Sequence, residues 1–267
     1  MSINIERVKT KNFSMDFFRF GKGEKTLVIL PGVSVKSVMD SADIIEKDYQ
    51  IMEGDFTVYV FDRRKELPLS YTVKDMALDT IEAFKALKLT DIYLFGASQG
   101  GMIALEIAIN FPGIVKKLAL GSTCAYLNEE RFSACEKWIE LANKRDGVGL
   151  YLDFCEKLYP SNVFEAYRDA FISVGKTVTE EEFKRFIAIT EAMKSFNVVE
   201  SLNKIECPTL AIGSVDDAVL GPDSTQEIAE KLKAREDFEF YLYDGYGHAA
   251  FDTAPDYKEK LLGFFLK

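Results

Sequence analysis

The chain has 267 residues, of which 48% are hydrophobic and 28% charged, a composition typical of one soluble globular unit with a large core. Its net charge of −10 argues against a nucleic-acid surface, and we find no apolar run as long as a signal peptide or a membrane span. We therefore expect a cytoplasmic protein that binds neither nucleic acid nor a membrane.

Apolar runs, taken in chain order, predict the strands of a sheet. Two short strands are expected at 4–9 and 14–20, followed by runs at 26–30, 56–62, 92–95, 116–121, 208–213 and 238–245. Several of these runs are continuous instead of alternating, which is typical of strands covered on both faces. Segments with helical periodicity lie between them, such as Ala77, Ile81 and Phe84. The alternation predicts an α/β fold, a mostly parallel central sheet flanked by helices.

One stretch, residues 127–205, contains no good strand candidate. Apolar residues there recur at helical spacing, so we expect an inserted α-helical cap subdomain within a core formed by 1–126 and 206–267. At this spacing, aromatic residues more often pack a core than line a pocket. The residues that carry the pattern are Phe132, Cys135, Ile139, Ala142, Phe183, Phe186, Ile187 and Met193.

The four cysteines show no C-x-x-C pair, so the sequence predicts neither a zinc site nor a disulfide framework. They are Cys124, Cys135, Cys155 and Cys207, and buried reduced thiols are the simpler interpretation. The sequence predicts no cofactor and no metal, and it leaves the oligomeric state open.

The stretch "FGASQGG", residues 95–101, interrupts the apolar pattern between a strand and a helix. This is the context of a nucleophile elbow, G-x-S-x-G, with Ser98 as the nucleophile. A turn this sharp leaves no room for side chains at 96 and 100. Serine needs a base to take its proton. His248 is the one histidine of the chain and follows the last predicted strand, so it is the candidate base.

A carboxylate should orient the histidine, and two aspartates, Asp216 and Asp217, follow the strand that ends at Gly213. Adjacent residues point in different directions, so we expect only one of them to reach His248. An oxyanion hole also needs two backbone N–H groups. We expect these from Gln99, which follows the nucleophile, and from Val33 in the loop after an early strand.

With these residues, the sequence resembles the α/β-hydrolase fold superfamily, in its serine-hydrolase, esterase-like branch with a helical cap. "VFDRR" at 60–64 resembles the family's aspartate-x-arginine segment, and "DGYGHAAFDTAPDY" its catalytic-histidine segment. In the family the catalytic aspartate stands three residues after the glycine, and this resemblance selects Asp216. Two segments depart from the family, Pro31-Gly32 in place of histidine-glycine and "KELPLS" at 65–70 in place of a glycine-rich stretch.

These residues predict hydrolysis of small carboxylic esters through an acyl-enzyme, with Ser98, Asp216 and His248 as the triad. The partner is a small-molecule, ester-like substrate; thioesters, amides, lactones and carbon–carbon bonds remain open. The alternatives are a carbon–carbon bond hydrolase, a small aminopeptidase, or a non-catalytic ligand receptor on the same fold. An aminopeptidase would need cap carboxylates to bind an amine, and the candidates are Glu140, Asp153, Glu156 and Glu165.

Overall fold

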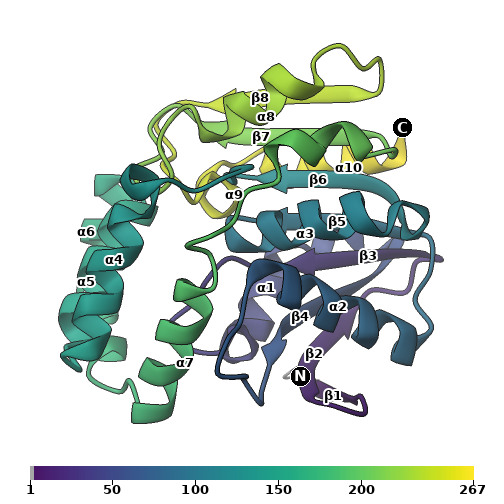
Figure 1. Cartoon of the computed structure of the whole chain (residues 1–267). Helices are drawn as coiled ribbons and strands as arrows, with labels where there is room; N and C mark the ends of the chain where they lie inside the picture. Colours follow the sequence, from purple (N-terminus) through teal and green to yellow (C-terminus); the bar gives the residue numbers. More distant parts are fainter. Residues whose placement is uncertain (1–2) are drawn as a thin grey trace.

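Figure 1 shows the computed structural model of the chain, which describes residues 3–267. Within these residues a single sheet of eight strands has the order β1-β2-β4-β3-β5-β6-β7-β8. The pairs β1–β2 and β2–β4 are antiparallel, and every other pair is parallel. This confirms the predicted α/β fold with a mostly parallel sheet. The strands are β1 (Ile5–Lys9), β2 (Ser14–Phe20), β3 (Lys25–Leu30), β4 (Phe56–Arg64), β5 (Ile92–Ala97), β6 (Val115–Gly121), β7 (Thr209–Ser214) and β8 (Phe238–Tyr243).

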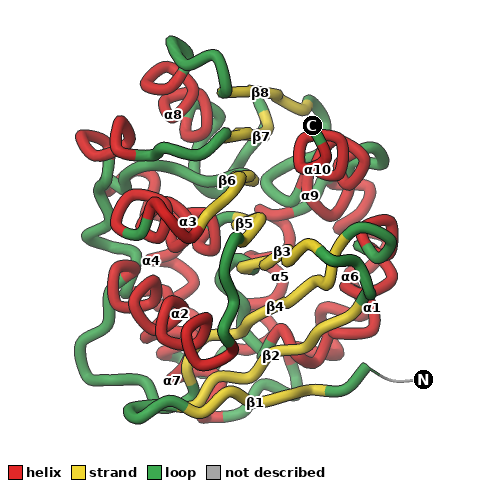
Figure 2. Tube along the Cα trace, turned by 90° about the vertical axis from the view of Figure 1, so that its right-hand side faces the viewer, coloured by secondary structure: helices red, strands yellow, loops and turns green. Residues whose placement is uncertain are grey.

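Helices cover both faces of the sheet, as Figure 2 shows along the strands. On one face lie α2 (Val73–Leu87), α3 (Gln99–Asn110) and α8 (Ser224–Leu232), and on the other lie α1 (Ala42–Asp48), α9 (Ala250–Thr253) and α10 (Tyr257–Leu266). Each face has its own apolar core, one including Ile103 of α3 and the other Phe265 of α10. Because the central strands are covered on both faces, they are largely apolar, with charged residues near their amino ends. Short 3₁₀ turns complete the fold, η1 (Val38–Ser41), η2 (Gln50–Met52), η3 (Pro112–Ile114) and η4 (Val199–Lys204).

Four helices lie between β6 and β7, where the sequence predicts the cap. They are α4 (Glu129–Asn143), α5 (Gly147–Leu158), α6 (Ser161–Gly175) and α7 (Glu180–Glu191), called here the helical insertion. Figure 1 shows them as a layer beside the carboxyl ends of the parallel strands. Their side chains join the same apolar core as α2 and α3. The division of the chain at residues 127 and 205 stays a prediction.

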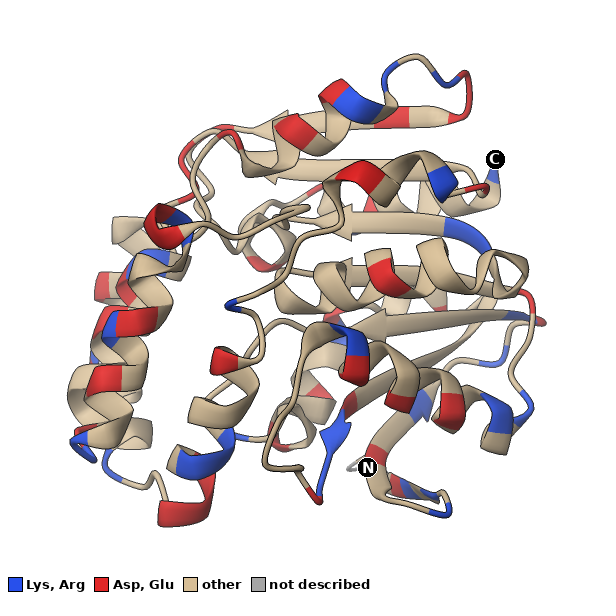
Figure 3. Ribbon diagram, in the orientation of Figure 1, with Lys and Arg blue, Asp and Glu red and all other residues tan. Residues whose placement is uncertain are grey.

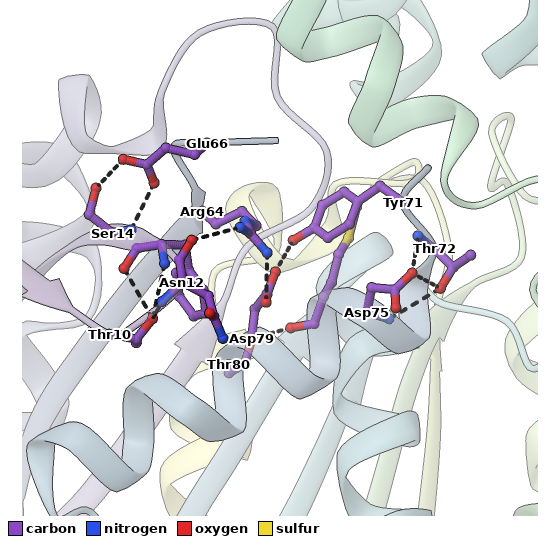
Figure 4. Close-up of polar contacts among 12 residues, drawn as sticks. Thr10, Asn12, Ser14, Arg64, Glu66, Tyr71, Thr72, Asp75, Asp79 and Thr80 are labelled. Atoms are coloured by element: carbon purple, nitrogen blue, oxygen red, sulfur yellow. Dashed lines mark hydrogen bonds and ion pairs between the residues drawn. The ribbon is translucent and has the colours of Figure 1, made fainter. Parts of the chain in front are cut away.

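Polar contacts fasten the antiparallel end of the sheet to α2. Arg64, at the end of β4, donates to the Asp79 carboxylate and to the Asn12 carbonyl, both at 3.2 Å. The Tyr71 hydroxyl donates to the second oxygen of Asp79 at 2.8 Å, and Figure 4 shows the three side chains converging. Thr72 begins α2 with a capping box closed by Asp75. These contacts are structural and lie apart from the predicted site.

Charged residues lie mostly on the helices and loops. In Figure 3, Lys and Arg alternate with Asp and Glu over the outer surface of the helical insertion, whereas the central strands are largely uncharged. Among residues 3–267, no helix combines the length and the apolar character needed to cross a bilayer.

Candidate active site

Ser98 lies at the turn between β5 and α3, with its backbone at φ 52° and ψ −122°. A positive φ at a non-glycine residue is strained, and a strained strand-to-helix turn is the geometry of a nucleophile elbow. The glycines explain how the turn fits. A Cβ at Gly96 would lie 2.3 Å from the Gly100 carbonyl oxygen, and one at Gly100 would lie 1.8 Å from the Leu30 carbonyl oxygen. The predicted steric role of both glycines is therefore confirmed.

Neighbouring strands hold the backbone of Ser98 in this conformation. Its N–H donates to the Gly121 carbonyl at 2.8 Å, and its carbonyl accepts from the Gly101 N–H at 2.9 Å and from the Thr123 hydroxyl at 2.8 Å. Thr123 lies just beyond β6, so the elbow is fixed by the adjacent strand as well as by its own helix. Sequence reasoning missed Thr123, because no local pattern marks it.

His248 lies on the loop after β8 and is 2% exposed. Gly245 and Gly247, with φ of 82° and 65°, give the loop its path. A Cβ at Gly247 would lie 2.8 Å from the Leu158 carbonyl oxygen, and the same oxygen accepts a hydrogen bond from the Ala249 N–H at 2.9 Å. The loop that carries the histidine therefore rests directly on the end of α5.

The structure corrects the choice between the two aspartates. Asp217 Oδ2 lies 2.7 Å from His248 Nδ1, and the Asp217 side chain is 2% exposed. Its Oδ1 accepts from the N–H groups of Val219 and Leu220, at 2.8 and 2.9 Å. The expectation that Asp216 reaches the imidazole is wrong.

Asp216 is exposed and holds the histidine loop by its backbone instead. It accepts from the Ser214 hydroxyl and, at 3.0 Å, from the Gly247 N–H. The family spacing, which places the catalytic aspartate three residues after Gly213, selects the wrong residue here. The hydrogen-bonded pairing of β7 with β8 continues past Ser214. The Val215 N–H still donates to the Tyr243 carbonyl, at 2.9 Å, so the buried turn begins one residue later than the family spacing implies.

The two expected oxyanion donors flank the nucleophile. A Cβ at Gly32 would lie 3.2 Å from Ser98 Cβ and 3.6 Å from its Oγ, so the segment that leads to Val33 packs against the nucleophile. Gln99 is the first residue of α3, where N–H groups have no partner within the helix. Within residues 3–267, neither the Val33 nor the Gln99 N–H donates an intramolecular hydrogen bond. Val33 also lines the cavity described below, whereas Gln99 is fully buried.

Ser98 and His248 open into one cavity of about 790 Å³ between the sheet edge and the helical insertion. The described residues show no hydrogen bond between the Ser98 hydroxyl and the imidazole. Apolar side chains dominate the wall. Those from the helical insertion and from the turns directly after its helices include Trp138, Tyr151, Phe154, Leu158, Tyr159, Phe171, Val174 and Met193.

Sequence periodicity identified few of these wall residues. Of the eight positions it singled out, Cys135 and Met193 line the cavity, whereas Phe132, Phe183 and Phe186 are buried in the core. Helical spacing marks a buried face without telling which buried residue borders an empty space. The aromatic wall comes mainly from α5 and α6, which the sequence analysis did not resolve into separate helices.

The charged groups at the cavity also differ from those the sequence suggested. The candidates Glu140, Asp153, Glu156 and Glu165 do not line it. The carboxylates that do are Asp40, Asp48 and Asp252, together with one lysine, Lys36, which pairs with Glu182 of α7 at 3.1 Å.

Two thiols border the cavity. Burial raises the pKa of Cys135 and of Cys155 to about 12 in each case, so neither is a thiolate at neutral pH. All four cysteines are buried and unpaired. The described residues contain no group of three or more His, Cys, Asp or Glu side chains placed to hold a metal ion.

Comparison with solved structures supports the fold. The chain is similar to MGS-M2, an α/β hydrolase enzyme from a Medee basin deep-sea metagenome library, with a TM-score of 0.86, 19% identity and 98% of each chain covered. It is also similar to an enol-lactonase from Burkholderia xenovorans LB400, with a TM-score of 0.82, 15% identity, and 98% of this chain and all of that one covered. The chain has the α/β-hydrolase fold.

Sequence comparison defines the family. The chain belongs to the family described as "Serine aminopeptidase, S33", whose model matches residues 68–253. A putative carbamate hydrolase RutD from Agrobacterium fabrum is 26% identical over 81% of this chain and 85% of its own length. Mouse serine hydrolase BPHL is 26% identical over 155 residues, and the match spans about half of its length (53%). The chain is therefore an enzyme, a serine hydrolase of the α/β-hydrolase class.

Proposed function

We propose that the chain hydrolyses carboxylic esters with a bulky apolar group, through an acyl-enzyme on Ser98. The observation that carries this proposal is the cavity, because one apolar space is bordered by both Ser98 and His248 and is flanked by free backbone donors. A neutral, largely apolar ester fits such a wall better than a charged substrate does.

The mechanism follows from the positions of the groups. His248 Nδ1–H donates to Asp217, which fixes the tautomer and leaves Nε2 as the base. The Ser98 oxygen attacks the ester carbonyl while Nε2 takes its proton, and the N–H groups of Val33 and Gln99 bind the resulting oxyanion. The imidazolium then protonates the departing alkoxide. Water repeats the sequence on the acyl-enzyme, releasing the acid and restoring Ser98. Catalytic hydrogen bonds often form fully only in the substrate complex, so the separation of Ser98 and His248 in the free enzyme is compatible with this path.

A fluorophosphonate probe and a panel of p-nitrophenyl esters test the proposal. The wild-type protein should be labelled and should hydrolyse apolar esters, whereas Ser98→Ala should lose both activities, with a fall in kcat of about 10⁵ or more. Ser41→Ala is a matched control, since Ser41 lines the same cavity and its hydroxyl caps no helix N–H. Equal labelling of the wild type and Ser98→Ala would contradict the assignment of the nucleophile.

A second candidate is the release of an N-terminal residue from a peptide. The carboxylates of Asp48 and Asp252 at the cavity favour it, because a substrate ammonium group could pair with them. Aminoacyl p-nitroanilides, with and without an acetylated amine, distinguish the two functions. A preference for the free amine that disappears in Asp48→Asn and Asp252→Asn would support aminopeptidase activity, and turnover of neutral esters alone would reject it.

A further inference from the structure

The side chain of Arg63, the residue before the end of β4, is buried and joins two segments of the site. It is 6% exposed, its Nε donates to Gln99 Oε1 at 3.1 Å, and its Nη2 donates to the Pro31 carbonyl at 2.6 Å. Pro31 lies two residues before Val33. One guanidinium therefore contacts both segments that carry the proposed oxyanion donors.

The Gln99 side chain extends this connection to the helical insertion. Gln99 is fully buried, and its Nε2 donates to the Ile189 carbonyl of α7 at 2.6 Å. The amide is thus held at both ends, by Arg63 on the sheet side and by α7 on the other. Neither Arg63 nor Gln99 lines the cavity, so these side chains do not touch a substrate there.

Asp62, the residue before Arg63, also contacts the loop after β3 and helix α7. Its carboxylate accepts from the Arg63 N–H at 2.7 Å and from the Ser37 hydroxyl at 2.6 Å, and it forms an ion pair with Arg185 of α7. Burial lowers the pKa of Arg63 to about 10, which still leaves the guanidinium charged at neutral pH. The Asp62 charge balances it, which a buried arginine requires.

The next residue, Arg64, provides a contrast within the strand. Successive side chains of a strand point to opposite faces, and Arg64 turns away toward Asp79 and the Asn12 carbonyl, as Figure 4 shows. The two adjacent arginines therefore contact different regions. Arg63 contacts the candidate site, and Arg64 contacts α2 and the turn between β1 and β2.

We propose that Arg63 and the Gln99 side chain are positioning residues, which place the Val33 and Gln99 N–H groups and tie that placement to the docking of α7. The inference rests on the proposed function. Oxyanion donors must hold their positions within about 0.5 Å to stabilise the transition state. A continuous series of three hydrogen bonds, which runs from the Pro31 carbonyl through the buried Arg63 and Gln99 side chains to the Ile189 carbonyl, provides that rigidity.

The test compares an oxygen ester with its thionoester, in which C=S replaces the reacting C=O. Sulfur is larger and accepts hydrogen bonds weakly, so a well-placed oxyanion hole favours the oxygen ester, and a displaced one loses that preference. Arg63→Met and Gln99→Met should each lower kcat for the oxygen ester by about 10- to 100-fold, with KM changed less than about threefold. The ratio of oxygen-ester to thionoester rates should fall by about tenfold.

Controls separate positioning from stability. Arg64→Met removes the neighbouring arginine, and Thr190→Val removes a buried hydrogen bond of α7 to the Phe186 carbonyl. Both should keep the wild-type ratio even where they lower the melting temperature. Arg185→Met, which frees α7 from Asp62, should lower the ratio by about threefold, and an unchanged ratio there would overturn the link to α7.

The nearly isosteric Gln99→Met carries the test if Arg63→Met does not fold. An unchanged ratio in folded Gln99→Met would reject the positioning role. If the wild type hydrolyses no ester, or if its activity survives Ser98→Ala, the proposed function itself fails and the oxyanion role fails with it. Wild-type ester hydrolysis and the Ser98→Ala control therefore distinguish a failure of the proposed function from a failure of the positioning role alone.

Discussion

The carboxyl edge of the sheet and the helical insertion meet at one cavity but contribute different things to it. At the sheet edge, polar groups are buried and bonded, as with Asp217, which uses both oxygens, and Ser98, whose backbone is held on both sides. The helical insertion contributes mainly aromatic and aliphatic surface. The chemistry therefore depends on the rigid edge of the sheet, whereas the choice of substrate depends on the shape of the helical insertion. Changes at the edge should therefore affect kcat, and changes in the insertion should affect selectivity.

After loss of the nucleophile itself, the largest expected effect is at the two aspartates of the sheet edge. Asp217→Asn removes the charge beside His248 Nδ1 and places an amide against it, so kcat should fall by about 10³ to 10⁴. Asp216→Asn keeps an acceptor for the Gly247 N–H and should lower kcat by about tenfold or less. Steady-state kinetics on one ester checks both variants. The opposite ranking would contradict the geometry.

A smaller effect is expected where the loop after β3 packs on the nucleophile. In Gly32→Ala, the new methyl group would lie 3.2 Å from Ser98 Cβ and must displace the loop or the serine. We expect kcat to fall by about 10- to 100-fold, within the range for a misplaced oxyanion donor. Gly113→Ala is the control, since a Cβ there meets nothing within 4 Å. Equal kcat values for the two variants would show that the contact does not matter.

The smallest effect tests the helical insertion. Phe171 of α6 lines the cavity and stacks on Tyr159, with ring centroids 6.1 Å apart. Phe171→Ala should enlarge the space and raise kcat/KM for longer acyl chains relative to acetyl by about four-fold for each additional buried methylene. Tyr167→Ala is matched to it, because Tyr167 packs on Phe171 from the exposed side without lining the cavity. If both variants changed the ratio of kcat/KM values to the same extent, Phe171 would not determine the acyl-chain selectivity.

Most of the fold could be predicted from the sequence because its strands are continuous apolar runs separated by clear turns. β2 has the expected bounds, and the elbow between β5 and α3 lies where the glycines place it. Such features depend on local chemistry, which one sequence contains. The sequence predicts Ser98 and His248 as site residues for the same reason, since one lies in a motif and the other is the sole histidine, and both line one cavity.

The features that could not be predicted depend on contacts between distant segments. The family spacing selects Asp216 instead of Asp217. It cannot include the bond between the Val215 N–H and the Tyr243 carbonyl, which continues the β7–β8 pairing by one residue and joins positions far apart in the sequence. Similarly, Arg63 occupies the variable position of the aspartate-x-arginine pattern, which implies no role for it, and its bonds to Pro31 and Gln99 span more than 30 residues. A spacing rule cannot choose reliably between two adjacent identical residues such as Asp216 and Asp217.

The contact of the Ala249 N–H with the Leu158 carbonyl makes the base an observable reporter of the helical insertion. Because the chain has one histidine, its two imidazole nitrogens give ring-nitrogen NMR resonances that no second histidine can overlap. A ligand that moves Leu158 at the end of α5 should also move Ala249, the residue next to His248. In protein enriched with nitrogen-15, titrating such ligands while following this one imidazole would report motion of the helical insertion as a change in chemical shift.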